Sequence, residues 1–105
     1  MKQPCVYILA SKRNGTLYVG VTSDLARRTW EHRVGVLEGF TKYYGAHRLV
    51  YAEFHASMAD AILREKRVKR WRRAWKLALI EQDNPGWRDL YDEFVPESGS
   101  PPSRG

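Results

Sequence analysis

Residues 5–21 read CVYILASKRNGTLYVGV and decide the fold. Two runs rich in β-branched and aromatic residues, Cys5 to Ala10 and Thr16 to Val21, flank a polar turn. Asn14-Gly15 within that turn is typical of the positive-φ residues of a tight hairpin. We therefore expect two antiparallel strands, and each would carry one tyrosine, Tyr7 or Tyr18.

A helix and a third strand are expected next. Thr22-Ser23-Asp24 offers N-cap side chains for a helix from Leu25 to about Val34, which Gly35 would end. Arg48 to His55 then alternates along a strand. The alternation predicts one face with Leu49, Tyr51 and Glu53 and an opposite face with Val50, Ala52 and Phe54.

The second half of the sequence is predicted to be helical. Ser57 would cap a helix that runs to about Arg73, and Trp75 to Gln82 either continues it or forms a separate helix. Asn84-Pro85-Gly86 interrupts the pattern before a short amphipathic segment, Trp87 to Phe94. The order of elements predicts an α+β domain, with a small antiparallel sheet covered by helices.

The length and composition limit the classes of function. The 105 residues suit one domain, residues 1–95, followed by a Pro-, Ser- and Gly-rich tail, 96–105, that we expect to be disordered. The longest N-terminal apolar run is too short for a signal peptide or a membrane span, which favours a cytoplasmic protein with no membrane partner. Cys5 alone cannot form an internal disulfide, and no Cys/His cluster has the spacing of a zinc site.

Positive charge is concentrated in one segment. The chain has a net charge of +6, and eight of its basic residues lie between Arg64 and Lys76, where Glu65 is the only acid. This favours a nucleic-acid partner over a merely solvated helix face. The expected phosphate contacts are Arg27, Arg67, Lys69, Arg70 and Arg73. Trp71, Trp75 and Trp87 would either be core or bind a partner protein.

Glu65 interrupts an apolar helix stripe. A regular helix from Ser57 places Met58, Ala61, Ile62 and Val68 on one side, with Glu65 among them. A buried carboxylate is costly unless it is paired or binds a metal. Glu65 is therefore either a metal or site residue or the partner of Lys69 in an i,i+4 ion pair. We expect this helix face to meet the tyrosine hairpin.

The first predicted helix also turns polar groups toward the sheet. Arg28 and His32 lie three and seven residues after Leu25, on the same side, and Arg27 points away. Taken alone, Arg28 could form a structural ion pair, and His32 could simply favour the carboxyl end of the helix. Together with the two phenols and Glu65, they supply a base, a phosphate clamp, a proton partner and a metal ligand.

These residues resemble a known family. Val6-Tyr7, Tyr18-Val19-Gly20, Arg28, His32 and Glu65 are similar to the motifs of the GIY-YIG nuclease superfamily, over Cys5 to Lys76. The resemblance is greatest to small standalone bacterial members. It implies a three-stranded antiparallel sheet flanked by helices, and hydrolysis of a DNA phosphodiester bond with one divalent metal, Mg²⁺ or Mn²⁺.

The resemblance also implies roles for the residues. Glu65 would bind the metal, Arg28 would stabilise charge on the phosphate, and His32 would hydrogen-bond a phenol. Tyr7 would be the candidate base and Tyr18 would hold water or phosphate, although the sequence leaves open which tyrosine is the base. A phenol has a pKa near 10, so a nearby cation would have to lower it.

Some positions depart from the family pattern. Cys5-Val6 and Val19 replace Gly-Ile and isoleucine, and Val21 replaces a lysine found in some branches, including excision-repair nucleases. Gly20 is a further site candidate. Asn84 either matches an asparagine that the family carries late in the domain or starts the turn before Pro85.

The resemblance favours a particular kind of nuclease. No second domain is expected for sequence recognition, so the predicted enzyme is a structure- or backbone-directed DNA endonuclease, acting at flaps, branches or single strands. The alternative is an inactive nucleic-acid-binding module with the same fold. The oligomeric state stays open.

Overall fold

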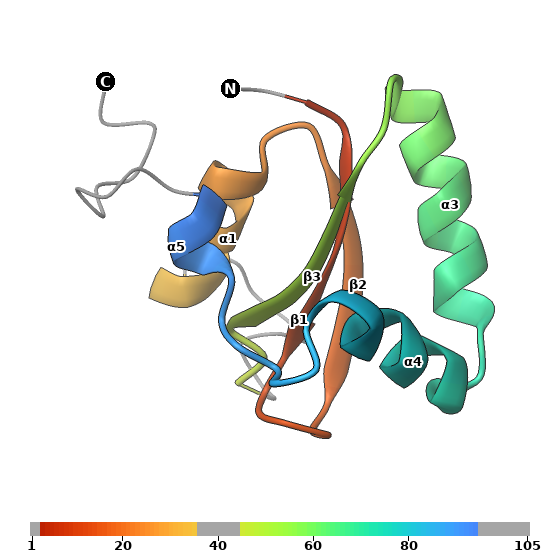
Figure 1. The fold of residues 1–105 in the computed structure, drawn as a ribbon. Coiled ribbons are helices and arrows are strands. Elements are labelled where there is room, and N and C mark those ends of the chain that lie inside the picture. The colour runs from red at the N-terminus through yellow and green to blue at the C-terminus, as the bar shows by residue number, and fades with distance from the viewer. Residues whose placement is uncertain (1–2, 36–44, 95–105) are drawn as a thin grey trace.

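The computed structural model describes residues 3–35 and 45–94. The expected tail, 96–105, lies outside them. The elements are β1 (Cys5–Ala10), β2 (Leu17–Thr22), α1 (Leu25–Val34), β3 (Arg48–Phe54), α3 (Met58–Arg70), α4 (Arg73–Asp83) and α5 (Tyr91–Phe94). The strands form one antiparallel sheet in the order β2-β1-β3 (Figure 1), which confirms the predicted α+β class with a three-stranded sheet.

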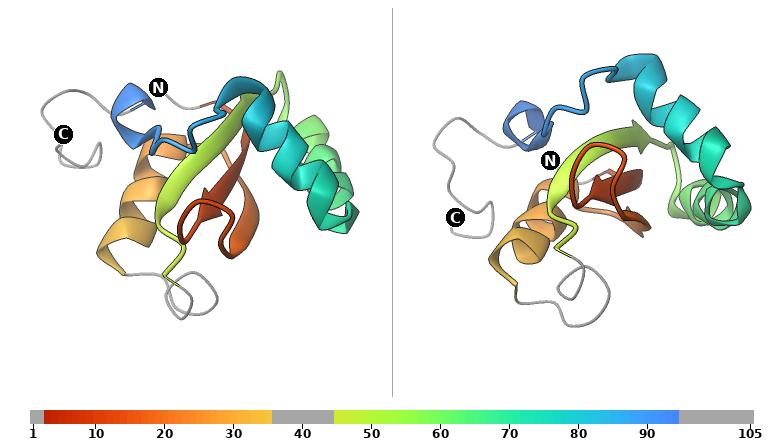
Figure 2. Two further views of the ribbon diagram at one scale, coloured as in Figure 1. Left: turned by 60° about the horizontal axis from the view of Figure 1, so that its bottom comes forward. Right: turned by 90° about the horizontal axis from the view of Figure 1, so that it is seen from below.

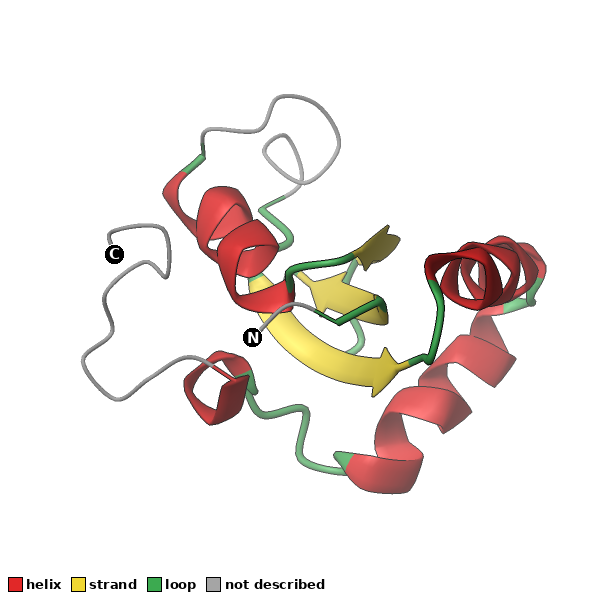
Figure 3. Ribbon diagram, turned by 90° about the horizontal axis from the view of Figure 1, so that it is seen from above, coloured by secondary structure: helices red, strands yellow, loops and turns green. Residues whose placement is uncertain are grey.

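Helices cover both faces of the sheet. In Figures 1 and 3, α1 and α5 lie on one side, and α3 and α4 lie on the other. Strand alternation divides the core in the same way, because neighbouring side chains point to opposite faces. Val6 and Ile8 of β1 belong to the cluster with α3 and α4. Tyr7 and Leu9 belong to the cluster with α1 and α5.

The hairpin pairs each tyrosine with a residue of the other strand. Tyr7 faces Gly20 across the ladder, and Tyr18 faces Leu9. β2 runs from Leu17 to Thr22, one residue later than the sequence predicts. The three-layer arrangement therefore places Tyr7, Tyr18 and Gly20 on the α1 side of the sheet.

The turn differs from prediction at one position. Asn14 has a positive φ of 57°, as expected, whereas Gly15 is not among the described residues with positive φ, so that part of the prediction was wrong. Gly15 is instead required by space, because a Cβ there would lie 2.3 Å from Ser11 Oγ. The backbone amide of Gly15 donates to the carbonyl of Lys12, at 2.9 Å, which closes the turn.

The predicted alternation of β3 was wrong around Val50. Leu9 pairs with Leu49 while Ile8 pairs with Tyr51, so the register shifts between them. An extra residue in one strand moves the side chains after it to the other face. Leu49 consequently packs on the α1 side, and both Val50 and Tyr51 belong to the cluster on the α3 side.

The helices begin where their caps predict. Asp24 accepts a hydrogen bond from the Arg27 amide at the start of α1, and Gly35 ends that helix with a φ of 76°. Ser57 caps α3 by accepting from the Asp60 amide. Both N-caps use a side-chain oxygen to satisfy an otherwise unpaired amide of the first turn.

The helix α3 ends at Arg70, short of the predicted Arg73. The backbone of Trp71 is extended, with a ψ of 148°, and α4 is a separate helix. Figure 2 shows α4 leaving the end of α3 at an angle. The contact stripe of α3 is also narrower than predicted: Ala61, Glu65 and Val68 are buried, whereas Ile62 is 38% exposed.

The segment after α4 is mostly irregular. Only Tyr91–Phe94 is helical within the predicted amphipathic stretch. Trp87 has a φ of 56° and is fully buried, and its indole nitrogen donates to Glu81 at 2.7 Å. Trp87 is therefore part of the core. Its burial removes it from the three tryptophans considered for partner binding. Across the described parts of the chain, no helix is long and apolar enough to cross a membrane.

Candidate active site

Three aromatic rings meet between the sheet and α1. The Tyr7 hydroxyl lies 3.2 Å from Nε2 of His32. The ring centroids are 6.3 Å apart for Tyr7 and Tyr18, and 5.4 Å apart for Tyr18 and His32. Strand register and the inward face of α1 thus bring both tyrosines and the histidine into one cluster.

Gly20 makes room for this cluster. A Cβ at Gly20 would lie 2.5 Å from Cζ and the hydroxyl of Tyr7, and 3.0 Å from Cε2 of Tyr18. Because Gly20 pairs directly with Tyr7, the phenol lies over its bare backbone. The absence of a side chain at Gly20 therefore lets the two phenols lie close together.

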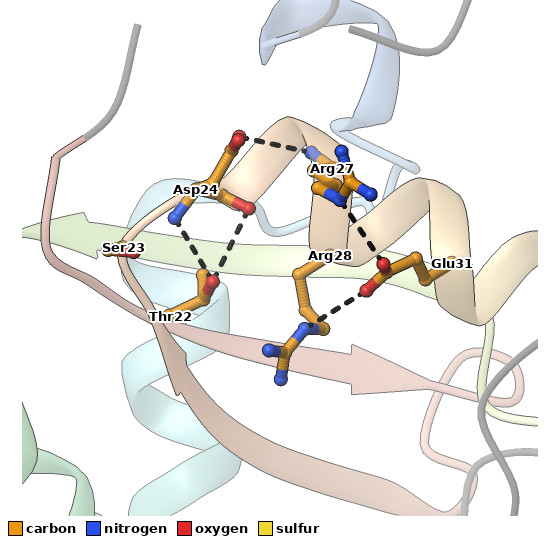
Figure 4. Close-up of a pocket in the computed structure, with 6 residues that line it drawn as sticks. All are labelled: Thr22, Ser23, Asp24, Arg27, Arg28 and Glu31. Atoms are coloured by element: carbon orange, nitrogen blue, oxygen red, sulfur yellow. Dashed lines mark hydrogen bonds and ion pairs between the residues drawn. The ribbon is translucent and has the colours of Figure 1, made fainter. Parts of the chain in front are cut away.

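Arg28 reaches toward the strands from α1, and Figure 4 shows Arg27 on the outer side of the helix. Glu31 accepts from both arginines, at 3.3 Å from each Nε. The Arg28 side chain keeps 40% of its surface exposed. A pocket of about 270 Å³ opens beside it, lined by Thr22, Ser23, Asp24, Arg27, Arg28 and Glu31.

The environment keeps Tyr7 and His32 neutral. Burial raises the pKa of the Tyr7 phenol, Tyr18 adds to the rise, and the Arg28 guanidinium opposes it without cancelling it. Burial, together with the Arg28 charge, lowers the pKa of His32 from its ordinary 6.5 to about 4. The pair therefore holds a protonated phenol against an uncharged imidazole at neutral pH.

Glu65 lies apart from the aromatic cluster. It projects from α3, which packs on the opposite face of the sheet, against the edge strand β2 and the central strand β1. As predicted, the helix that carries Glu65 meets the tyrosine hairpin, but strand alternation turns both tyrosine rings to the other face of the sheet. Glu65 is 7% exposed, and its carboxylate pairs with Lys69 at 2.6 Å.

The donor set limits the metals that could bind. Among residues 3–35 and 45–94, no group of three or more His, Cys, Asp or Glu side chains could hold an ion. A lone carboxylate fits Mg²⁺, which usually keeps several waters and binds through one or two carboxylates and the substrate phosphates. Glu65 is compatible with that mode of binding, although its carboxylate is already paired with the ammonium group of Lys69.

The predicted phosphate contacts differ in their surroundings. Arg67 and Arg70 are exposed and, with Leu63, Lys66 and Lys69, line a groove of about 510 Å³ on α3. Arg27 and Lys69 pair with acids of their own helices. Arg73 donates to the carbonyl oxygens of Asn14 and Gly15, at 2.8 and 2.7 Å, and so ties α4 to the hairpin turn.

Asn84 has structural partners. It is 2% exposed, and its Nδ2 donates to the carbonyl oxygens of Val50 and Arg88, at 3.2 and 2.9 Å. Its Oδ1 accepts from the Arg88 amide at 3.0 Å. This arrangement ties the end of α4 to β3 on the face away from the tyrosines, and fits the turn interpretation of Asn84.

A second polar cluster was missed from the sequence. Glu53 accepts from the Tyr51 hydroxyl at 2.5 Å, from Arg64 Nε at 2.9 Å, and contacts His55 Nε2 at 2.6 Å. The alternation of Tyr51 and Glu53 on β3 with His55 just after it was a usable signal, but the sequence does not reveal that Arg64 of α3 faces them. This cluster joins β3 to α3.

Comparison with known proteins agrees with the fold. Residues 3–78 match the family model for the GIY-YIG catalytic domain. The chain belongs to this family. Its fold is therefore nuclease-like, and the GIY-YIG family typically uses a divalent metal and a nucleic-acid substrate.

Small bacterial GIY-YIG proteins are similar to the chain along most of its length. A UPF0213 protein of Staphylococcus haemolyticus is 35% identical over 82 residues, which cover 78% of this chain and 99% of the relative. A UPF0213 protein of Staphylococcus saprophyticus is 33% identical with the same coverage. The solution NMR structure of a UPF0213 protein from Bacillus halodurans has a TM-score of 0.53 and 30% identity, and the match covers 84% of this chain and 93% of that one.

Proposed function

We propose that this protein is a metal-dependent DNA endonuclease that recognises the backbone or shape of its substrate. The observation that carries the proposal is the convergence of two phenols, an imidazole and a guanidinium on one face of β1 and β2. Neutral proton carriers beside a fixed cation suit attack of water on a phosphodiester.

We assign the contact with attacking water to Tyr18. Tyr7 has no exposed surface, and burial raises its pKa, so it is a poor base toward solvent. Tyr18 is only partly buried and lies beside both Tyr7 and His32. In this scheme Tyr18 accepts the proton from water as it passes its own hydroxyl proton to the uncharged imidazole of His32, the ring beside it. Tyr7, which contacts Nε2 of His32, holds that ring in position.

Arg28 is the proposed phosphate clamp. Its guanidinium interacts with the Tyr7 phenol from α1 and still faces the pocket at the start of that helix (Figure 4). Glu31 steadies it through a 3.3 Å contact. An arginine fixed in this way stabilises negative charge that develops on a phosphoryl oxygen.

Glu65 would hold the metal. When bound, Mg²⁺ or Mn²⁺ would polarise the phosphate and stabilise the leaving oxygen. Because α3 and α1 flank the edge strand β2 from opposite faces, we propose that the scissile phosphate lies across the edge of β2, within reach of residues from both sides. Lys69 would release the Glu65 carboxylate to the metal.

The exposed face of α3 would hold the rest of the substrate. Lys66, Arg67 and Arg70 line its groove, where they can neutralise backbone phosphates. Phosphate contacts position a nucleic acid without carrying sequence information. Recognition of this kind suits DNA flaps, branches or single strands rather than a fixed sequence.

A cleavage panel tests the proposal. Single-stranded, duplex, flap and branched DNA would be incubated with the protein and Mg²⁺ or Mn²⁺, and product strands resolved on denaturing gels. We expect Tyr18→Phe, Arg28→Ala and Glu65→Gln each to lower the cleavage rate, by roughly 10²–10³-fold where a charge-stabilising group is removed.

Two exposed residues outside the site provide charge-matched controls. Arg13→Ala removes one cation and Asp83→Asn removes one carboxylate, and neither should change the rate. If Glu65→Gln cleaves as fast as the wild type, the metal role of Glu65 is wrong.

The second candidate function is an inactive module that binds nucleic acid. The ion pair between Glu65 and Lys69 favours it, since that carboxylate is already satisfied without a metal. This alternative predicts salt-sensitive binding that is indifferent to Glu65→Gln, and no cleavage of any substrate with either metal.

A further inference from the structure

The start of α4 carries an exposed tryptophan. Trp75 keeps 53% of its surface exposed, although tryptophan side chains are on average highly buried. Trp71, half-buried at the end of α3, packs against the core and meets Trp75 edge-on, with ring centroids 6.0 Å apart and an angle of 79° between the rings. Trp71 therefore orients an indole that still faces solvent.

A shallow pocket lies against these rings. It has a volume of about 260 Å³ and is lined by Trp71, Trp75, Ala78, Leu79 and Gln82. Drug-sized ligands and cofactors occupy pockets of roughly 300–1,000 Å³, so this one suits a single planar ring. Apolar side chains form most of the lining, while Gln82 offers an amide that can donate to and accept from the edge of a ring.

One arginine lies over each of the two indoles. The Arg72 guanidinium lies 5.3 Å from the centroid of Trp75, and that of Arg64 lies 5.0 Å from the centroid of Trp71. Both arginines belong to the segment from Arg64 to Lys76, in which Glu65 is the only acid. Because Arg64 also pairs with Glu53, the exposed Arg72 is the more available cation for an occupant of this pocket.

We infer that the pocket at Trp75 is a stacking site for an unpaired base of a nucleic-acid strand. A base offers a flat ring to the indole and a phosphate chain to the surrounding arginines, and aromatic stacking combined with a basic surface is the usual way to bind single strands. A second copy of this chain would bring an equally basic surface against this one, which like-charge repulsion opposes.

This inference deepens the proposed function, on which it rests for the class of substrate. It names nucleic acid with unpaired bases, such as a single strand or flap, as the preferred ligand. The groove lies on α3, and the pocket is lined by Trp71 and by residues of α4, the helix that follows, so phosphates on α3 and a base on Trp75 can belong to one strand.

Binding without a divalent metal tests the inference separately from cleavage. Fluorescence anisotropy would compare three probes of equal length: labelled oligothymidylate, an abasic strand with the same phosphates, and a blunt duplex. We expect Trp75→Ala to raise the Kd for oligothymidylate by roughly 5- to 150-fold, the range for loss of one stacked base. Trp75→Phe should recover most of the affinity.

The abasic strand isolates the role of the base. Trp75→Ala should leave its Kd unchanged, because no ring is present to stack, and Val34→Ala, at an exposed apolar residue of α1, should leave all three values unchanged. Thermal melts followed by circular dichroism would verify that each variant folds. These measurements need no catalysis, so absence of cleavage would count against the endonuclease and leave the base site standing.

Three outcomes would overturn the inference. Equal loss of affinity for oligothymidylate and the abasic strand would show that Trp75 supports only phosphate binding. An unchanged Kd for oligothymidylate in Trp75→Ala would show that the pocket is not used. A concentration-dependent dimer that Trp75→Ala converts to a monomer, measured by analytical ultracentrifugation, would assign the pocket to a second copy of the chain.

Discussion

Gly20 fixes the position of Tyr7 at the scale of single residues. Gly20→Ala would place a Cβ 2.5 Å from the Tyr7 hydroxyl, and Tyr7 is fully buried, so the ring cannot move into solvent. We expect the free energy of unfolding to fall by roughly 1–3 kcal/mol, the usual cost of overpacking, measured by urea denaturation.

A second glycine provides the matched control for this change. At Gly86 the nearest atom to an added Cβ is Arg88 Cγ, 3.8 Å away, so Gly86→Ala should be nearly neutral. Wild-type stability in Gly20→Ala would mean that the phenols can rearrange and that their spacing does not depend on this glycine.

His32 makes stability depend on pH. Its pKa falls from 6.5 to about 4 in the folded protein, because burial and the Arg28 charge disfavour the imidazolium. Between those values the unfolded chain binds more protons than the folded one, so the free energy of unfolding decreases as pH falls. We expect a loss of roughly 2 kcal/mol from pH 7 to pH 5, measured by urea denaturation at each pH.

The variant His32→Gln separates this effect from other titrations. It removes the group that titrates, so its stability should change less over the same pH interval. Carboxyl groups titrate mostly below pH 5, outside the interval. An equal pH dependence in the variant and the wild type would assign the effect to another group.

Glu53 joins two elements, β3 and α3. Burial alone would raise the pKa of its carboxyl, but hydrogen bonds from Tyr51, Arg64 and His55 outweigh burial and lower the pKa. Glu53→Gln should therefore destabilise the protein at pH 7 by about 1.5–3 kcal/mol, the range for hydrogen bonds to a charged group, measured by thermal or urea unfolding.

The stability conferred by Glu53 also has a pH signature. Because its folded pKa is lowered, its contribution is present above the ordinary pKa of 4.5 and disappears as pH falls below that value. The wild type and Glu53→Gln should thus converge in stability in acid. Glu93→Gln, on the exposed face of α5, is the control that should change little.

Most elements could be predicted from local sequence signals. The caps at Asp24, Ser57 and Gly35 place helix ends almost as observed, since each acts through bonds to neighbouring residues. The bulge at Val50 and the end of α3 at Trp71 were not predictable in this way. Both depend on contacts with elements distant in sequence, which a local pattern does not contain.

At the scale of the whole molecule, the candidate site also combines features that local sequence predicts with features that depend on contacts between distant elements. The helical phase of α1 predicts that Arg28 and His32 turn toward the strands, and they do. The phase of α3 likewise predicts that Glu65 is buried, but it does not specify which face of the sheet the helix covers. Tertiary packing decides that: α3 meets the tyrosine hairpin as predicted, but the candidate residues lie on both faces of the sheet at β2.

The distribution of charge over the whole molecule leads to a last prediction, about salt. If Arg67 and Arg70 in the α3 groove each neutralise one phosphate, replacing both with alanine should make the plot of log K against log salt less steep by about 1.8 for duplex DNA, or about 1.4 for a single strand. Fluorescence anisotropy between 50 and 200 mM salt, concentrations over which such slopes are usually resolved, measures this. The double variant Lys12→Ala, Arg13→Ala removes the same charge from the exposed hairpin turn and should retain the wild-type slope. Equal slopes for both double variants would show that binding follows net charge, and that the groove on α3 is not where the backbone lies.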